Sequence, residues 1–203
     1  MELHECIEKR RSIRHYLPKE VPLETLGEIM DHARLAPSAG NAQNWRFVIV
    51  TEPAIKKEVA EICYNQHWMT EAPVHIVLCN SHKKLTTLYK DTGKMFGIQD
   101  CAIIGAYIQL LAVDRGLGTC WVGAFDAEKL HGLLRIADDV KVEAVITLGW
   151  PDEVKHIGQI RNEFTDLCYF EKWGNKEARK EGFSLKEKVK SSSSLIKGLF
   201  KKQ

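Results

Sequence analysis

The stretch TLGEIMDHARLAPSAGNAQNWRFVIV, residues 25–50, joins a helix pattern to a strand pattern through a polar loop. Leu26 and Ile29 belong to a row of apolar residues that recurs at the spacing of one helical face. Residues 46–50 are short and rich in β-branched side chains, as a strand is. The loop between them, PSAGNAQNW at 37–45, carries more neutral hydrogen-bonding side chains than a turn requires.

The same alternation of helix and strand patterns continues through most of the chain. It indicates an α+β domain in which helices flank a central mixed sheet. A glycine-punctuated crossing is expected at 116–125. The patterns predict helices near the N-terminus and over 22–36, 53–65, 86–115 and 126–136, with strands over 46–50, 74–80 and 142–150.

Composition and charge describe one globular body with a basic tail. The chain has 203 residues, 44% of them hydrophobic, which suits a single domain with a full core. Residues 176–203 contain nine Lys or Arg against three Glu, which gives this segment a net charge of +6. Because the whole chain has a net charge of +2, residues 1–175 carry −4. We therefore expect a domain over 1–175 and a tail over 176–203, disordered or forming an amphipathic helix. The small total charge gives no indication of nucleic-acid binding.

Several features favour a cytoplasmic protein without a metal site. The six cysteines contain no CxxC pair, and the histidines do not cluster as ligands do. The apolar run at 101–113 is shorter than the ~20 residues of a membrane span and predicts a buried helix. The tail sequence SSSSLIKGLFKKQ at 191–203 has two interpretations: contact with anionic lipid, or, as we prefer, a solubilising tail.

Common nucleotide-binding and hydrolase motifs are absent from the sequence. No G-x-G-x-x-G fingerprint and no P-loop occurs, and no G-x-S-x-G elbow is present. Any ligand binding or catalysis by this chain therefore depends on other residues.

Three other motifs suggest a ligand when they are taken together. RRSIR at 10–14 concentrates guanidinium groups that suit phosphate or carboxylate oxygens, although taken alone it is better interpreted as a solvated basic patch. The amides and hydroxyls of 37–45 suit the edge of a heteroaromatic ring. In TCWVGAF at 119–125, the small residues Gly123 and Ala124 permit close approach of a flat ligand to the backbone. Flavin mononucleotide (FMN) combines a phosphate, a polar chain and such a ring.

The order and spacing of RRSIR, PSAGNAQNW and GLGTCWVG resemble the nitroreductase family of FMN-dependent oxidoreductases over residues 4–173. The resemblance implies an α+β fold built as an intertwined homodimer with two FMN sites at the subunit interface. This chain departs from the family pattern in two places. Asn44 precedes the tryptophan where many members have proline, and Gln159 replaces a basic residue near the end of the domain.

The resemblance also assigns roles to individual residues. One group would hold the phosphate, the ribityl chain and the N1/O2 side of the flavin, and it comprises Arg10, Arg11, Ser12 and Arg14. A second group would reach the FMN mainly from the other subunit, and it comprises Pro37, Ser38, Ala39, Asn41 and Gln43. Asn65 would bond the pyrimidine edge, Val122, Gly123 and Ala124 would pass beside the ring, and Arg161 would close on the phosphate.

The implied activity is ping-pong transfer of hydride from NAD(P)H through bound FMN to a small conjugated acceptor, such as a nitroaromatic or a quinone. The chemistry belongs to the cofactor, so no catalytic side chain is required. Two alternatives remain open at this point. One is a specialised relative, a reductive dehalogenase or a flavin-cleaving enzyme, and the other is a non-catalytic flavin-binding redox sensor.

Overall fold

A computed structural model describes residues 1–152 and 160–176 of the chain. It divides the chain into two units, Met1–Val154 and Lys155–Gln203. The first unit contains the sheet and most of the helices. The predicted tail at 177–203 and Gln159 lie outside the described residues, and the predicted domain boundary after residue 175 stays a prediction.

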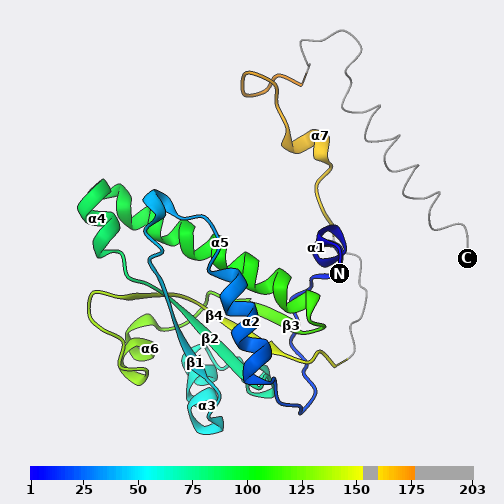
Figure 1. The fold of residues 1–203 in the computed structure, drawn as a ribbon, viewed down its shortest axis with the longest axis vertical. Coiled ribbons are helices and arrows are strands. Elements are labelled where there is room, and N and C mark those ends of the chain that lie inside the picture. Colours follow the sequence, from blue (N-terminus) through cyan, green and yellow to red (C-terminus); the bar gives the residue numbers. More distant parts are fainter. Residues whose placement is uncertain (153–159, 177–203) are drawn as a thin grey trace, which may run out of the picture. The chain divides into compact units, whose positions relative to one another are not determined.

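The centre of the first unit is a four-stranded sheet in the order β1-β2-β4-β3 (Figure 1). The strands are β1 (Trp45–Val50), β2 (Val74–Asn80), β3 (Gly118–Val122) and β4 (Lys141–Gly149). All pairings between these strands are antiparallel. In the described residues, the parallel component of the expected mixed sheet is one isolated bridge, Ser12 to Thr119. A glycine-punctuated crossing was expected at 116–125, but the structure places strand β3 within this stretch.

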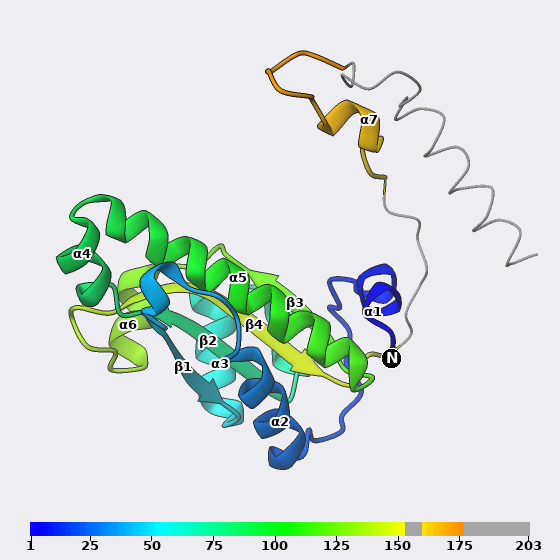
Figure 2. The same ribbon diagram turned by 45° about the horizontal axis from the view of Figure 1, so that its top comes forward.

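Helices cover both faces of the sheet (Figures 1 and 2). Helices α2 and α5 pack on one face, and α3 and α6 on the other. The α-helices of this unit are α1 (Leu3–Lys9), α2 (Leu23–Ala33), α3 (Pro53–Ile62), α4 (Lys83–Tyr89), α5 (Thr92–Asp114) and α6 (Ala127–Leu133), with 3-10 helices η1 (Ala39–Asn41) and η2 (His67–Glu71).

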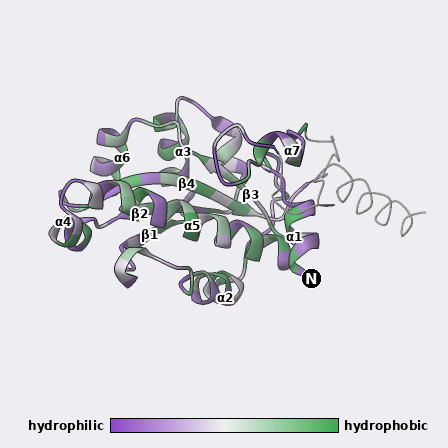
Figure 3. Ribbon diagram, turned by 90° about the horizontal axis from the view of Figure 1, so that it is seen from above, coloured by the Kyte–Doolittle hydropathy of each residue, from purple (hydrophilic) through white to green (hydrophobic). Residues whose placement is uncertain are grey.

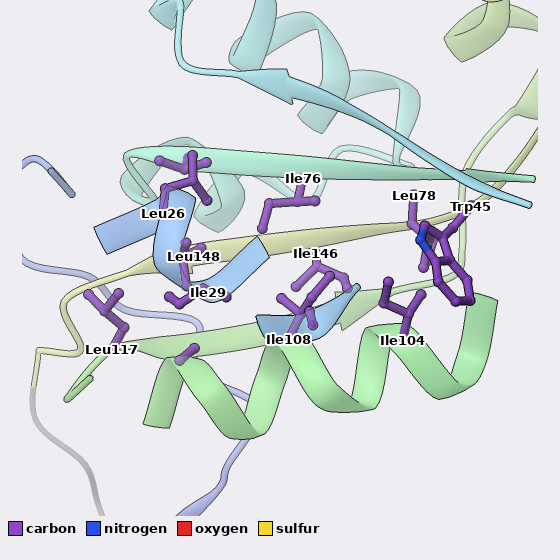
Figure 4. Packing of buried hydrophobic residues seen from close by; sticks show 14 of the residues in the cluster. Leu26, Ile29, Trp45, Ile76, Leu78, Ile104, Ile108, Leu117, Ile146 and Leu148 are labelled. Carbon is purple, nitrogen blue, oxygen red and sulfur yellow. The ribbon is translucent and has the colours of Figure 1, made fainter. Parts of the chain in front are cut away.

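The alternation of side chains along the strands produces two hydrophobic cores. Ile146 and Leu148 of β4 face α5, where Ile104 and Ile108 point back toward them (Figure 4). Val145, the residue before Ile146 in the strand, faces the opposite core under α3 and α6. Burying an Ile or Leu side chain contributes about 1.5–3 kcal/mol, so this double-sided burial stabilises the sheet from both faces.

The single helical region predicted at 86–115 is wrong in one respect, because the structure divides it into α4 and α5. Lys90 has φ 50° and ψ −132°, a conformation that no helix contains, so the chain turns there. Helix α5 is long and apolar enough to cross a membrane by length and composition. Helices that pack into a protein core meet the same criterion, and one face of α5 is buried on the sheet.

The described part of the second unit is short. It contains α7 (Phe164–Leu167) and a tilted contact between the rings of Tyr169 and Trp173, with 4.6 Å between their centroids. Lys176 lies 4.1 Å from the ring centroid of Tyr169.

Candidate flavin site

The segment after α1 is extended and lies along strand β3. Ser12 forms a parallel bridge with Thr119, and the Ile13 amide donates to the Thr119 carbonyl at 2.9 Å. Ile13 packs on Gly118, where an added Cβ would lie 2.6 Å from the Ile13 Cγ1 atom. The structure therefore shows RRSIR in an extended conformation.

Alternation along this extended segment gathers Arg10, Ser12 and Arg14 around one thiol. Burial raises the pKa of Cys120, while Arg14, a hydrogen bond from Ser12 and Arg10 act in the opposite direction. All three residues are therefore close enough to Cys120 to act on it. Ser12 and Arg14 are also exposed to solvent, so this row offers an external anion one hydroxyl and two guanidinium groups.

Arg11 occupies a different environment from its neighbours. One of its terminal nitrogens donates to the carbonyls of Glu8, at 2.6 Å, and Arg10, at 2.8 Å. It thereby satisfies carbonyl groups that the end of α1 leaves without helical partners. Its predicted contact with FMN stays a prediction.

The segment that carries Asn65 lies beside Arg14. The Arg14 guanidinium carbon is 5.7 Å from the ring centroid of Trp68 in η2. Helix α3 ends at Ile62, earlier than predicted, and Asn65 has φ 58° in an exposed turn. The Asp126 amide donates to the Ile62 carbonyl at 3.1 Å, which brings the loop that follows β3 to the end of α3.

The backbone after β3 is open to a ligand. Val122 is buried, whereas Gly123 and Ala124 are exposed. An added Cβ at Gly123 would meet only Trp121, at ordinary contact distances of 3.4 Å and more. Guanidinium and hydroxyl groups along β3, with exposed backbone directly after this strand, form a donor set that suits a phosphate attached to a flat ring, so the residues present fit FMN.

The loop at 37–43 has a costly backbone conformation. Gly40, Asn41 and Gln43 all have positive φ, at 54°, 51° and 48°. Two internal hydrogen bonds that involve side chains support it, from the Gln43 amide to the Ser38 hydroxyl at 3.0 Å and from the Gln43 side chain to the Asn41 side chain at 3.1 Å. Pro37, Asn41 and Gln43 are exposed, and Ser38 and Ala39 are half-buried. Left-handed residues of this kind are most often found at functional sites.

Asn44 and Asp100 support this loop, and neither was among the residues predicted to contact the flavin. The Asn44 side chain donates to Asn80 at 2.8 Å and to the Gly97 carbonyl at 3.3 Å. The Ala39 amide donates to Asp100 at 2.9 Å. A signal was nevertheless present, since aspartate is unusual in the middle of an apolar helix. Asn44 is thus a buried structural residue, which accounts for its presence where proline is common.

Helix α1, which precedes residues 10–14, and the loop at 37–43 contact different parts of α5. The loop is bonded to Asp100, whereas the N-terminus of the chain, just before α1, pairs with Asp114 at 2.6 Å. At 1.5 Å per residue, these two aspartates are roughly 20 Å apart along the helix axis. Within the described part of the chain, no hydrogen bond joins the loop to residues 10–14. Arg161 belongs to the second unit, and its predicted approach to the phosphate stays a prediction.

Two buried basic residues support η2 and were not anticipated. The Lys56 ammonium donates to the Ala72 carbonyl at 2.7 Å, and His75 Nε2 donates to the Met69 carbonyl at 2.8 Å. Burial lowers the pKa of Lys56, and burial lowers the pKa of His75 to about 4. Both groups therefore position Trp68 and its neighbours. Across residues 1–152 and 160–176, no cluster of His, Cys, Asp or Glu could hold a metal ion.

Comparison with known proteins agrees with this geometry. The model of the nitroreductase family matches residues 7–68 and 63–150, so the chain belongs to the nitroreductase family. A protein of Methanothermobacter thermautotrophicus, named as an NADH dehydrogenase/NAD(P)H nitroreductase, is 33% identical over 177 residues, covering 85% of this chain and 88% of the relative.

Solved structures show the same fold. A nitroreductase family protein from Clostridium novyi NT is 30% identical with a TM-score of 0.68, covering 86% of this chain and 96% of that one. An FMN-dependent nitroreductase from Clostridium difficile R20291 is 27% identical with a TM-score of 0.66, covering 88% and 98%. The predicted family and α+β fold are therefore confirmed.

Proposed function

We propose that this protein transfers hydride equivalents from NAD(P)H, through bound FMN, to a small conjugated acceptor such as a nitroaromatic or a quinone. Its membership of the nitroreductase family makes it an NAD(P)H-dependent flavin oxidoreductase with FMN as cofactor. The observation that carries the proposal is the row of Arg10, Ser12 and Arg14 along β3, together with the exposed backbone at 123–124 that directly follows this strand.

Each part of this surface has a distinct task in the proposal. Arg10 and Ser12 hold the phosphate and the polar chain through charge-assisted hydrogen bonds. Arg14 places positive charge next to the N1/O2 side of the ring, and Trp68 fixes the direction of its guanidinium group. The Gly123 backbone orients the ring edge, and bound FMN supplies the two-electron chemistry.

A homodimer completes the site in this proposal. Helix α5 is apolar on the face that the sheet does not cover, where Met95, Ile98, Ile103 and Tyr107 are 36–52% exposed. A helix that is apolar all round is normally buried, so this face fits a protein partner. Helix α1 carries both hydrophobic and hydrophilic residues (Figure 3), and its Leu3 and Ile7 are exposed apolar residues as well.

A groove of about 480 Å³ between α1 and α5 continues this surface. Leu3 and Ile7 from α1 and Tyr107 and Leu111 from α5 are among its lining residues. A second copy seated over α5 would bring its own 37–43 loop to this chain's flavin. This arrangement accounts for a loop rich in polar groups that does not reach residues 10–14 of its own chain.

The cytoplasm is the compartment that the proposal favours. All six cysteines are free thiols, as expected in a reducing environment.

The visible absorption spectrum of the purified protein tests the proposed function first. We expect a bound chromophore with the mass of FMN, bleached by NAD(P)H and restored by a quinone or nitroaromatic. A protein that binds FMN without bleaching would be a sensor instead, and one that consumes its FMN would be a flavin-cleaving enzyme. Colourless protein that refuses added FMN contradicts the proposal altogether.

Light scattering on a sizing column tests the dimer. Tyr107→Glu places a charge on the exposed face of α5, so we expect a monomer that loses FMN. Leu23→Glu is the matched control, since Leu23 is 77% exposed on α2 and should leave the dimer intact. A flavin-loaded monomer would contradict the shared site.

A further inference from the structure

One turn of helix α5 holds both ends of the loop that spans residues 39–44. Asp100 accepts the Ala39 amide at 2.9 Å at the start of the loop. Three residues earlier on the same helix, the Gly97 carbonyl accepts from the Asn44 side chain at the end of the loop. Positions three apart share a helical face, so a single turn fixes both ends.

Close packing makes this attachment rigid. An added Cβ at Gly97 would lie 2.5 Å from the Asn80 side-chain nitrogen, so only glycine lets α5 approach the sheet here. Asn80 accepts from Asn44 at 2.8 Å and donates to Glu143 of β4 at 3.0 Å. A chain of buried polar contacts thus connects the end of the loop to the sheet.

Burying the Asp100 carboxyl in this position lowers the stability of the fold. It is 3% exposed, and its Oδ2 atom is buried without a hydrogen-bond partner in the described structure. Burial raises the pKa of the Asp100 carboxyl, and the hydrogen bond from Ala39 opposes this shift. A buried carboxylate with one unsatisfied oxygen lowers the stability of a fold. We therefore expect this residue to have another role.

The loop itself requires such support. Asn41 and Gln43 are non-glycine residues with positive φ, and such conformations persist only when their surroundings enforce them. The Asp100 bond lies immediately before them and is charge-assisted, which makes it stronger than a neutral one.

We propose that Asp100 is a positioning residue, which holds the 39–43 loop in its flavin-binding conformation by accepting the backbone N–H of Ala39. The proposal rests on the proposed function, in which this loop contacts FMN. Asp100 acts through the loop and does not itself touch the cofactor.

Hydrogen exchange on the purified wild-type protein and on Asp100→Ala tests the proposal without relying on turnover. We expect the amides of residues 39–43 to exchange roughly ten times faster or more in Asp100→Ala, because the lost bond is to a charged group. Asp91→Ala is the matched control. Asp91 is an exposed aspartate at the start of the same helix, its side chain does not cap that helix, and its loss should leave exchange in the loop unchanged.

Two further variants distinguish positioning from general damage. Asp100→Asn keeps an acceptor oxygen for Ala39 and should restore slow exchange and FMN affinity to within about threefold of the wild type. Ala39→Pro removes the donor while leaving Asp100 in place, and it should weaken FMN binding as Asp100→Ala does. Ser38 is already extended, at φ −143° and ψ 154°, as a residue before proline should be.

The outcomes separate this inference from the proposed function. Unchanged exchange in Asp100→Ala overturns the positioning role, as does equal damage in Asp100→Ala and Asp100→Asn. Wild-type protein that binds FMN while Asp100→Ala binds it equally well also overturns it, with the proposed function intact. A wild type that refuses FMN defeats the proposed function, whereas the exchange data would still report on the loop.

Discussion

The guanidinium group of Arg14 lies over the ring of Trp68, with 5.7 Å between its central carbon and the ring centroid. This contact joins the extended segment beside β3 to the 3-10 helix η2. Buried hydrogen bonds from Lys56 and His75 to backbone carbonyls keep η2 in place. The orientation of an exposed arginine is therefore set by a buried framework.

Arg14→Ala should weaken FMN binding roughly tenfold or more, because a hydrogen bond to a charged group contributes about 1.5–3 kcal/mol. It should also lower the reduction potential of the bound flavin, since positive charge near N1/O2 favours the anionic reduced form. Fluorescence titration gives the affinity, and spectroelectrochemistry gives the potential. Arg14→Lys keeps the charge and should fall between the two proteins. An unchanged potential in Arg14→Ala would remove Arg14 from its proposed role.

Gly118→Ala should destabilise the fold by about 1–3 kcal/mol, the usual cost of overpacking. Its new Cβ would meet Ile13 Cγ1 at 2.6 Å and push residues 12–14 away from β3. FMN affinity should fall with stability, as urea denaturation and flavin titration would show. In Gly27→Ala nothing lies within 4 Å of the added Cβ, so this helical control should be stabilised by about 0.5–1 kcal/mol. Similar effects from both substitutions would contradict the packing argument.

His75 should make stability fall as the pH drops from 6.5 toward 4. Its pKa in the folded protein is about 4, below the ordinary 6.5, so between these values the unfolded chain binds the extra proton. The contribution is fully present above pH 6.5, and about 3 kcal/mol of it is lost on acidification. Urea titrations of wild type and His75→Gln, which keeps a donor for Met69, isolate this contribution as the difference between two pH curves. Parallel curves would show that His75 does not titrate in this way.

Asn44 and Asn80 should be energetically coupled. Asn44→Ala removes the side chain that donates to the Asn80 side-chain oxygen and to the Gly97 carbonyl. It should lower the free energy of unfolding by about 1–3 kcal/mol, because both acceptors stay buried. A double-mutant cycle with Asn80→Ala, measured by urea denaturation, should give a coupling energy above about 0.5 kcal/mol. Additive effects would mean that the two side chains do not support the loop together.

Much of the secondary structure follows from local patterns. The row that includes Leu26 and Ile29 predicted α2, and the β-branched run at 46–50 predicted most of β1. Errors occurred where tertiary contacts outweigh local preference. Residues 118–122, within the stretch expected as a crossing, form a strand because β4 supplies their hydrogen-bond partners, and the helix predicted at 86–115 breaks at Lys90.

The sequence by itself determined the family, the α+β class and the residue types that suit FMN, because motif order and periodicity are local properties of the chain. The tertiary structure decided how those residues are held. The direction of Arg14 depends on Trp68, and the shape of the loop depends on its bonds to Asp100 and, through Asn44, to Gly97. These partners are distant in the sequence. Burial strengthens the hydrogen bonds to these partners, and the partners become buried only when the chain folds.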